Sequence, residues 1–155
     1  MIDITLRING EERALCVPAS RTLLDALRNN LKLTGSKNAC NQGVCGACTM
    51  LLDGMPVNAC LVLAANVAGR EIVTIEGLGE GGTLSPMQQA FVDAGAIQCG
   101  FCMSGMIVSA TAFLAENPQP SRQEIRAALS GNLCRCSGYV RVIDAVILAS
   151  ERMGA

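Results

Sequence analysis

The sequence contains no histidine and no tryptophan, and its aromatic residues are one tyrosine and three phenylalanines among 155 residues. Without histidine, Ser-His-Asp and Cys-His catalysis are excluded, together with zinc fingers that use two histidines, Rieske centres and histidine-ligated haem. The chain is instead rich in cysteine, with nine of these residues. Any metal chemistry must therefore be thiolate chemistry.

Charge and long apolar runs are also scarce. Charged residues make up 16% of the chain, against about 25% in ordinary globular proteins, and the only lysines are Lys32 and Lys37. This composition argues against nucleic-acid binding. The longest apolar stretches, 61–65 and 103–115, are shorter than the roughly 20 residues of a membrane-spanning helix. Since half of the residues are hydrophobic, we expect a subunit that buries apolar surface against a partner.

The N-terminus lacks the basic region of a signal peptide, because an acidic residue, Asp3, begins a strand pattern there. We therefore expect a cytoplasmic protein. In a reducing compartment, an odd number of cysteines is better interpreted as metal ligands or redox thiols than as a disulfide framework.

The first half of the chain shows strand patterns with one helix. The predicted elements are a hairpin of strands 2–8 and 13–17 around Asn9-Gly10, a helix from about 22 to 30, a Cys-rich loop over 34–48, a hairpin of 49–52 and 55–60 around Asp53-Gly54, and a strand over 71–75. This order predicts a β-grasp, ferredoxin-like domain over residues 1–76.

The second half shows only helical patterns. A Gly-rich linker is predicted over 77–84, followed by a helical domain over 85–155 and an α+β fold for the whole chain. The four predicted helices are one from Ser85-Pro86 to Gly95, one from 103 that stops before Pro118, one capped by Ser121 and Glu124 that ends before Gly131, and one from about Gly138.

The first group of cysteines has the spacing of plant-type ferredoxins, C-x4-C-x2-C followed by a distant cysteine. Its members are Cys40, Cys45, Cys48 and Cys60. Gly43 and Gly46 can adopt positive φ, which lets backbone N–H groups point at the sulfurs of a 2Fe-2S cluster. The alternative is a zinc site with four cysteines, but such sites prefer two C-x2-C pairs and only one is present here.

The second group consists of a C-x2-C pair and a C-x-C pair. Its members are Cys99, Cys102, Cys134 and Cys136. Each pair is expected directly before a helix, so two helix N-termini would face one anionic 2Fe-2S cluster. The alternatives are a thioredoxin-like dithiol at 99–102, which should follow a strand, and a zinc site, for which C-x-C is a poor fit.

Two further signals carry less weight. Gly77-x-Gly79-x-x-Gly82 matches the dinucleotide-binding fingerprint, but no second strand follows it, and we interpret it as a linker. Cys16 lies outside any ligand spacing and is expected to be a small half-buried residue rather than a reactive thiol.

Three segments resemble the small iron-sulfur subunit of molybdenum hydroxylases, the xanthine oxidase family, whose members act on carbon monoxide, aldehydes and N-heteroaromatics. The resemblance covers nearly the whole chain. The segments read LTGSKNACNQGVCGACT at 33–49, QCGFC at 98–102 and GNLCRCSGY at 131–139.

This resemblance implies a non-catalytic electron-transfer subunit. Electrons would come from a molybdenum cofactor, molybdopterin cytosine dinucleotide, in a large subunit, and would pass through two 2Fe-2S clusters to FAD in a medium subunit or to another acceptor such as a cytochrome. Gln98 would hydrogen-bond the cofactor, and Cys136 would lie beside its pterin amine. The alternatives are a free two-cluster ferredoxin-type carrier and a structural zinc module.

The chain departs from the family pattern at Ala39, where glycine is common, at Val44, where an acid is common, and at Met103-Ser104, where Thr-Pro is frequent. All eight expected ligands are nevertheless present. The departures bear on loop shape, reduction potential and subfamily.

Overall fold

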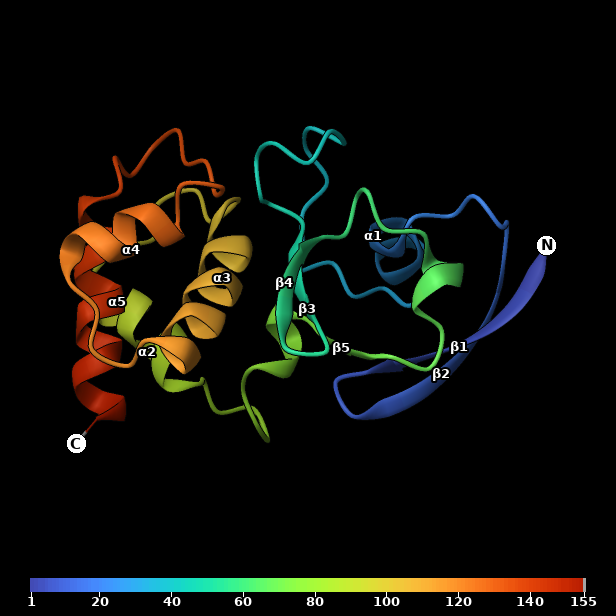
Figure 1. The fold of residues 1–155 in the computed structure, drawn as a ribbon, viewed down its shortest axis with the longest axis horizontal. Coiled ribbons are helices and arrows are strands. Elements are labelled where there is room, and N and C mark those ends of the chain that lie inside the picture. Colours follow the sequence, from blue (N-terminus) through green and yellow to red (C-terminus); the bar gives the residue numbers. More distant parts are fainter. Residues whose placement is uncertain (155) are drawn as a thin grey trace.

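The computed structural model describes residues 1–154 and has a sheet half and a helical half (Figure 1). The sheet half contains one mixed five-stranded sheet in the order β2-β1-β5-β3-β4, in which only β1 and β5 pair in parallel. Its elements are β1 (Ile2–Ile8), β2 (Glu11–Val17), α1 (Leu23–Asp25), a π-helical turn η1 (Ala26–Asn30), β3 (Thr49–Leu52), β4 (Met55–Asn58), a 3-10 turn η2 (Ala64–Val67), β5 (Glu71–Val73) and a 3-10 turn η3 (Ile75–Gly77).

Both predicted hairpins are present, and both use two-residue turns in which φ is positive at each central residue. These φ values are 52° and 82° at Asn9 and Gly10, and 49° and 82° at Asp53 and Gly54. Because so tight a turn lets the strands pair at once, β2 begins at Glu11 opposite Ile8, two residues earlier than predicted.

Two strands end earlier than predicted, each for a local reason. β5 ends at Val73 because the amide of Thr74 donates to the side chain of Asn9 (2.9 Å) instead of continuing the sheet. β4 ends at Asn58, and the next carbonyl, that of Ala59, accepts a hydrogen bond from Leu24 (3.2 Å). This departure from the sheet carries Cys60 into the core beside the Cys-rich loop.

The helical half has four helices, as predicted. They are α2 (Pro86–Asp93), α3 (Met103–Glu116), α4 (Arg122–Ala128) and α5 (Val140–Met153). Ser85 and Ser121 both form the reciprocal hydrogen bonds of a capping box, and Gly95 follows α2 with φ of 60°. α5 begins at Val140, two residues later than predicted, because Tyr139 adopts a left-handed conformation with φ of 69°.

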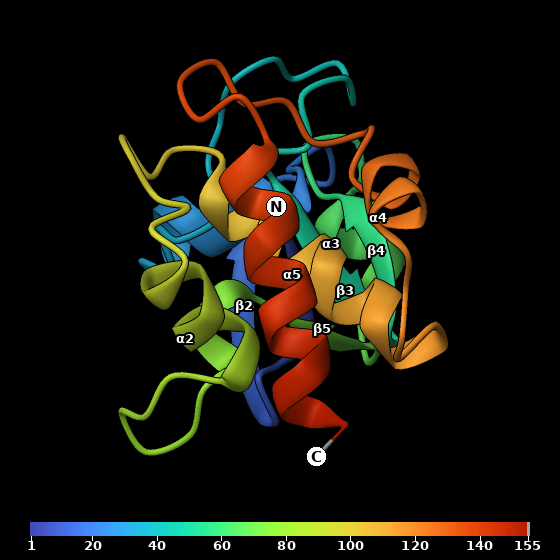
Figure 2. The ribbon, with the colours of Figure 1, turned by 90° about the vertical axis from the view of Figure 1, so that its left-hand side faces the viewer.

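Helix α3 joins the two halves. It packs against α2 and α4 on one side and against β3 and β4 on the other (Figure 1), while α2 and α4 flank α5 (Figure 2). A helix covered on both sides is expected to be apolar nearly all round, which accounts for the apolar run over 103–115. Among residues 1–154, no helix is both long and apolar enough to cross a membrane. The α+β fold class is confirmed.

Candidate metal centres

The first cysteine group is built mainly from the loop before β3. Gly43 and Gly46 both have φ of 71°, as the spacing predicted, and they turn the loop around the Cys40 sulfur. The amides of Gln42 and Cys45 each donate to Cys40 Sγ at 3.4 Å. These backbone donors lower the pKa of Cys40 to about 6, so the loop stabilises a thiolate before any metal is considered.

The other end of this group is buried. Cys48 and Cys60 belong to the core of the sheet half. Burial raises the pKa of Cys48 to about 11, and the neighbouring Cys60 thiol adds to the shift. A buried thiol of this kind stays protonated near neutral pH. Coordination to a metal cation would stabilise the thiolate and so allow the proton to be lost.

The second group joins two distant segments at the N-terminus of α3. Cys99 Sγ lies 3.7 Å from Cys136 Sγ, which lies 3.8 Å from Cys134 Sγ. Burial raises the pKa of Cys102 to about 12, and hydrogen bonding to the Cys134 thiol adds to it. Two thiolates bound to one metal at about 2.3 Å in a tetrahedral arrangement lie about 3.8 Å apart, so these sulfurs are close enough to bind one cluster.

Two side chains that sequence reasoning did not place at this centre organise Cys134. The Ser137 amide donates to Cys134 Sγ (3.3 Å), and the Ser137 hydroxyl lies 3.0 Å from the same sulfur. Burial opposes the thiolate, but these contacts outweigh it and lower the pKa of Cys134 to about 7. The amide of Cys134 donates to the Tyr139 hydroxyl (2.8 Å).

The prediction that both cysteine pairs directly precede a helix is correct for the first pair and wrong for the second. Cys102 is the N-cap of α3. Cys136, in contrast, is separated from α5 by three residues, Ser137, Gly138 and Tyr139, of which the last two have positive φ. The polar groups that face Cys134 are therefore those of a turn, because the left-handed residue redirects the chain before the helix begins.

The donor chemistry of both groups fits iron-sulfur clusters, which are held by four cysteine thiolates. Each group supplies four sulfurs, and in each group N–H donors already point at one sulfur. Within residues 1–154, no three Cys, Asp or Glu side chains converge as the ligands of a single ion.

Gln98, Cys99 and Cys136 are exposed, so the two positions singled out for a cofactor contact lie at the surface beside the second group. Large apolar side chains are exposed near them in the sequence, with exposed fractions of 43% for Ile97 and 46% for Phe101. These residues form a surface at which a cofactor or protein could meet the second cysteine group.

Cys16 is not half-buried as expected. It lies exposed on β2 opposite Asp3 of β1, because this position faces away from the core. Hydrogen bonding to the Asp3 carboxylate raises its pKa, which disfavours a reactive thiolate.

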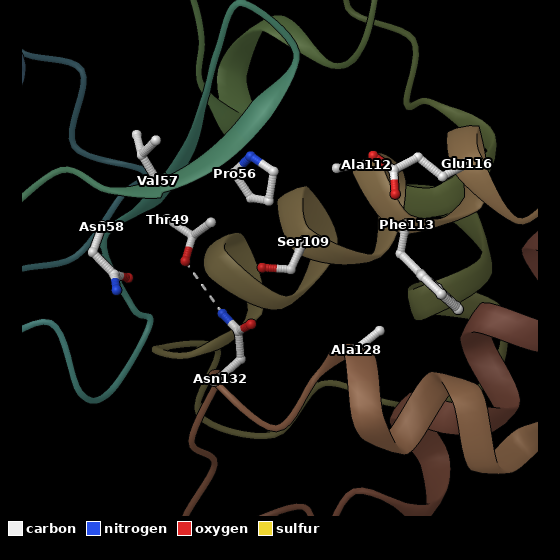
Figure 3. Close-up of a pocket in the computed structure, with 11 residues that line it drawn as sticks. Thr49, Pro56, Val57, Asn58, Ser109, Ala112, Phe113, Glu116, Ala128 and Asn132 are labelled. Carbon is white, nitrogen blue, oxygen red and sulfur yellow. Dashed lines mark hydrogen bonds between the residues drawn. The ribbon is translucent and has the colours of Figure 1, made fainter.

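A cavity of about 320 Å³ opens between the two halves (Figure 3). It is bounded by β3 and β4 on one side and by α3 on the other, and Asn132 lies hydrogen-bonded to Thr49 at 3.3 Å along its wall. Among the described residues that line it, Glu116 alone carries an ionisable side chain.

Comparison with known proteins agrees with these two centres. Residues 6–72 match a family described as a 2Fe-2S iron-sulfur cluster binding domain, and residues 74–147 match a [2Fe-2S] binding domain. The chain is 50% identical to the nicotine 6-hydroxylase small subunit of Paenarthrobacter nicotinovorans, over 99% of this chain and 92% of that protein. It is 47% identical to the nicotinate dehydrogenase small FeS subunit of Eubacterium barkeri, over 97% and 96% of the two chains.

Solved structures agree. A chain of quinoline 2-oxidoreductase from Pseudomonas putida 86 superposes with a TM-score of 0.94 at 48% identity, covering 99% of this chain and 97% of that one. Aldehyde oxidoreductase from Desulfovibrio gigas superposes with a TM-score of 0.93 at 45% identity, where 99% of this chain matches 17% of a longer chain. The chain therefore belongs to the family of small iron-sulfur subunits of molybdenum hydroxylases.

Proposed function

We propose that the chain relays electrons, one at a time, from a molybdenum site in a large catalytic subunit to an acceptor in another subunit. The observation that supports this proposal is the presence of two separate groups of four free cysteines in one small chain. In the first, Cys40, Cys45, Cys48 and Cys60 would hold one 2Fe-2S cluster. In the second, Cys99, Cys102, Cys134 and Cys136 would hold another.

The second centre would receive the electrons first. Gln98 and Cys136 are exposed beside it, where molybdopterin cytosine dinucleotide in the large subunit could contact both. The surrounding exposed apolar side chains, which also include Leu133 at 51%, support a buried interface with that subunit. The first centre would deliver electrons to FAD in a medium subunit, or to another acceptor such as a cytochrome.

The chain itself would supply ligands, orientation and electrostatics. Backbone N–H groups at Cys40 and the Ser137 contacts at Cys134 stabilise negative charge on sulfur, which is one of the ways a protein sets the potential of a cluster. Because thiolate ligands must stay reduced until the clusters are assembled, we propose a cytoplasmic location.

The test is anaerobic purification of the complex, followed by metal analysis and EPR of the dithionite-reduced protein. We expect iron rather than zinc, two distinct 2Fe-2S signals, and co-purification with larger chains. The isolated chain should show no hydroxylase activity, because the proposed molybdenum site lies in the large subunit. Zinc in place of iron, or a single signal of one spin per chain, would contradict the proposal. Two clusters without any larger chain would indicate a free carrier.

A further inference from the structure

The two cysteine-bearing loops touch each other directly, although they belong to different halves of the molecule. The amide of Leu133, next to Cys134, donates to the carbonyl of Cys45 at 2.9 Å. The side-chain amide of the preceding residue, Asn132, donates from the same nitrogen to the Gly46 carbonyl (3.1 Å) and to Thr49 Oγ1 (3.3 Å). The segment that leads to Cys134 and Cys136 is thus fastened to the loop that holds Cys45 and Cys48.

Asn132 is almost completely buried, with 5% of its surface exposed. Its two amide hydrogens are used on acceptors of the sheet half, and Thr49 reinforces the arrangement by donating its hydroxyl to the Gly46 carbonyl at 2.6 Å. A buried amide that lost these partners would bear the full desolvation penalty, so the contact resists separation of the two loops.

Glycines bring the backbones together at the same point. A Cβ on Gly105 of α3 would overlap the Gly46 carbonyl oxygen, and a Cβ on Gly46 would overlap the Gly131 carbonyl and lie 2.6 Å from Asn132 Nδ2. Three backbone segments, from the first loop, α3 and the second loop, therefore approach one another closely around the Asn132 side-chain amide. Gly105 lies inside a helix, where glycine is otherwise unfavourable.

We propose that Asn132 is a positioning residue that locks the Cys45 loop against the Cys134 loop and so sets the distance and orientation between the two clusters; this rests on the proposed function. In each transfer, one electron would leave the reduced second cluster and arrive at the oxidised first cluster, with no bond made or broken. Because the rate of such a step falls steeply with distance, a fixed contact between the loops keeps it fast.

The test uses the complete complex, reduced with dithionite until both clusters are paramagnetic. The magnetic interaction between two reduced clusters splits their EPR signals and weakens as they move apart. We expect Asn132→Ala and Gly105→Ala to retain iron but to lose this splitting. The matched controls are Asn117→Ala, which removes a side-chain hydrogen bond to Glu124, and Gly131→Ala, where an added Cβ meets no atom within 4 Å; both should keep the splitting.

An unchanged splitting in both Asn132→Ala and Gly105→Ala, at full iron content, would overturn the proposal. If these variants lose a cluster, Thr49→Val is the second test, because it nearly keeps the shape of the side chain and removes the hydroxyl that accepts from Asn132 and donates to the Gly46 carbonyl. Weakened splitting in Thr49→Val supports the role of Asn132, and unchanged splitting refutes it. Two clusters without splitting in the unaltered complex would also refute it. Absence of iron from the unaltered complex would instead contradict the proposed function.

Discussion

The two halves of the molecule assemble their cysteines in opposite ways. In the sheet half, three of the four lie within residues 40–48, and the loop itself supplies the N–H groups that reach Cys40. In the helical half, the sulfurs of Cys99 and Cys136 meet across 37 positions of sequence, brought together by packed helices. The first group of cysteines is held mainly by one loop, and the second group depends on the tertiary packing of helices. Damage to packing should therefore affect the two centres unequally.

The largest expected effect comes from removing a ligand in each half. Cys45→Ser and Cys136→Ser should each abolish one 2Fe-2S signal and about halve the iron content. The cluster in the helical half bridges 37 positions and that in the sheet half bridges 20, from Cys40 to Cys60. Loop-closure entropy then makes loss of the helical-half cluster more destabilising by about 0.5 kcal/mol.

Iron analysis, EPR after dithionite reduction and thermal unfolding measure these effects. Cys16→Ser is the matched control, because its exposed thiol lies on β2, away from both groups, and it should leave iron and both signals unchanged. A Cys136→Ser variant that is no less stable than Cys45→Ser would contradict the idea that the second cluster stabilises the fold by linking distant segments.

The contrast between the halves also separates what could be predicted from the sequence from what could not. The hairpin turns at Asn9-Gly10 and Asp53-Gly54, and the caps at Ser85 and Ser121, were predictable because each depends on a few neighbouring residues. The spacing of the first cysteine group was informative for the same reason. The structure confirms that Gly43 turns that loop with a positive φ.

The contacts that link distant segments were missed. Asn132 carries no local signal of its burial against Gly46 and Thr49, because its partners lie more than 80 positions earlier. Gly105, in contrast, was detectable, since an isolated glycine inside a helical pattern often marks a close packing contact. The left-handed conformation of Tyr139 depends on its hydrogen bond from Cys134 and on the turn at Ser137, which only the folded loop reveals.

Core substitutions are expected to have a smaller effect on the clusters than the loss of a ligand. They test whether each cysteine group depends on the packing of its own half. Phe91 is fully buried among α2, α3 and α5, and Leu6 is fully buried under the sheet. Phe91→Ala should cost about 3–5 kcal/mol and Leu6→Ala about 2–5 kcal/mol. On heating, the signal of the second cluster should disappear first in Phe91→Ala.

EPR of samples reduced after incubation at increasing temperature measures this order. We expect the Leu6→Ala variant to lose the first cluster no later than the second, because its cavity lies in the core that also contains Cys48 and Cys60. Simultaneous loss of both signals in both variants would mean that contact through α3 makes the halves one cooperative unit.

The smallest expected effect comes from the helix caps, which exist in both halves and allow a matched comparison. Thr22 accepts a hydrogen bond from the amide of Asp25 at the start of α1 (3.2 Å), and Ser121 accepts one from the amide of Glu124 at the start of α4 (3.3 Å). Replacing either by alanine leaves one amide at a helix start without this partner and should cost about 1 kcal/mol. In a chain of this size, that change lowers the unfolding midpoint by about 2–4 °C.

Because α4 leads into the Asn132 segment, Ser121→Ala should lower the temperature at which the second cluster is lost, whereas Thr22→Ala should do so for the first. Ser121→Thr and Thr22→Ser preserve the cap and serve as controls. If both alanine variants lowered the temperature of loss equally for both clusters, the stability of each cysteine group would not depend on its own half alone.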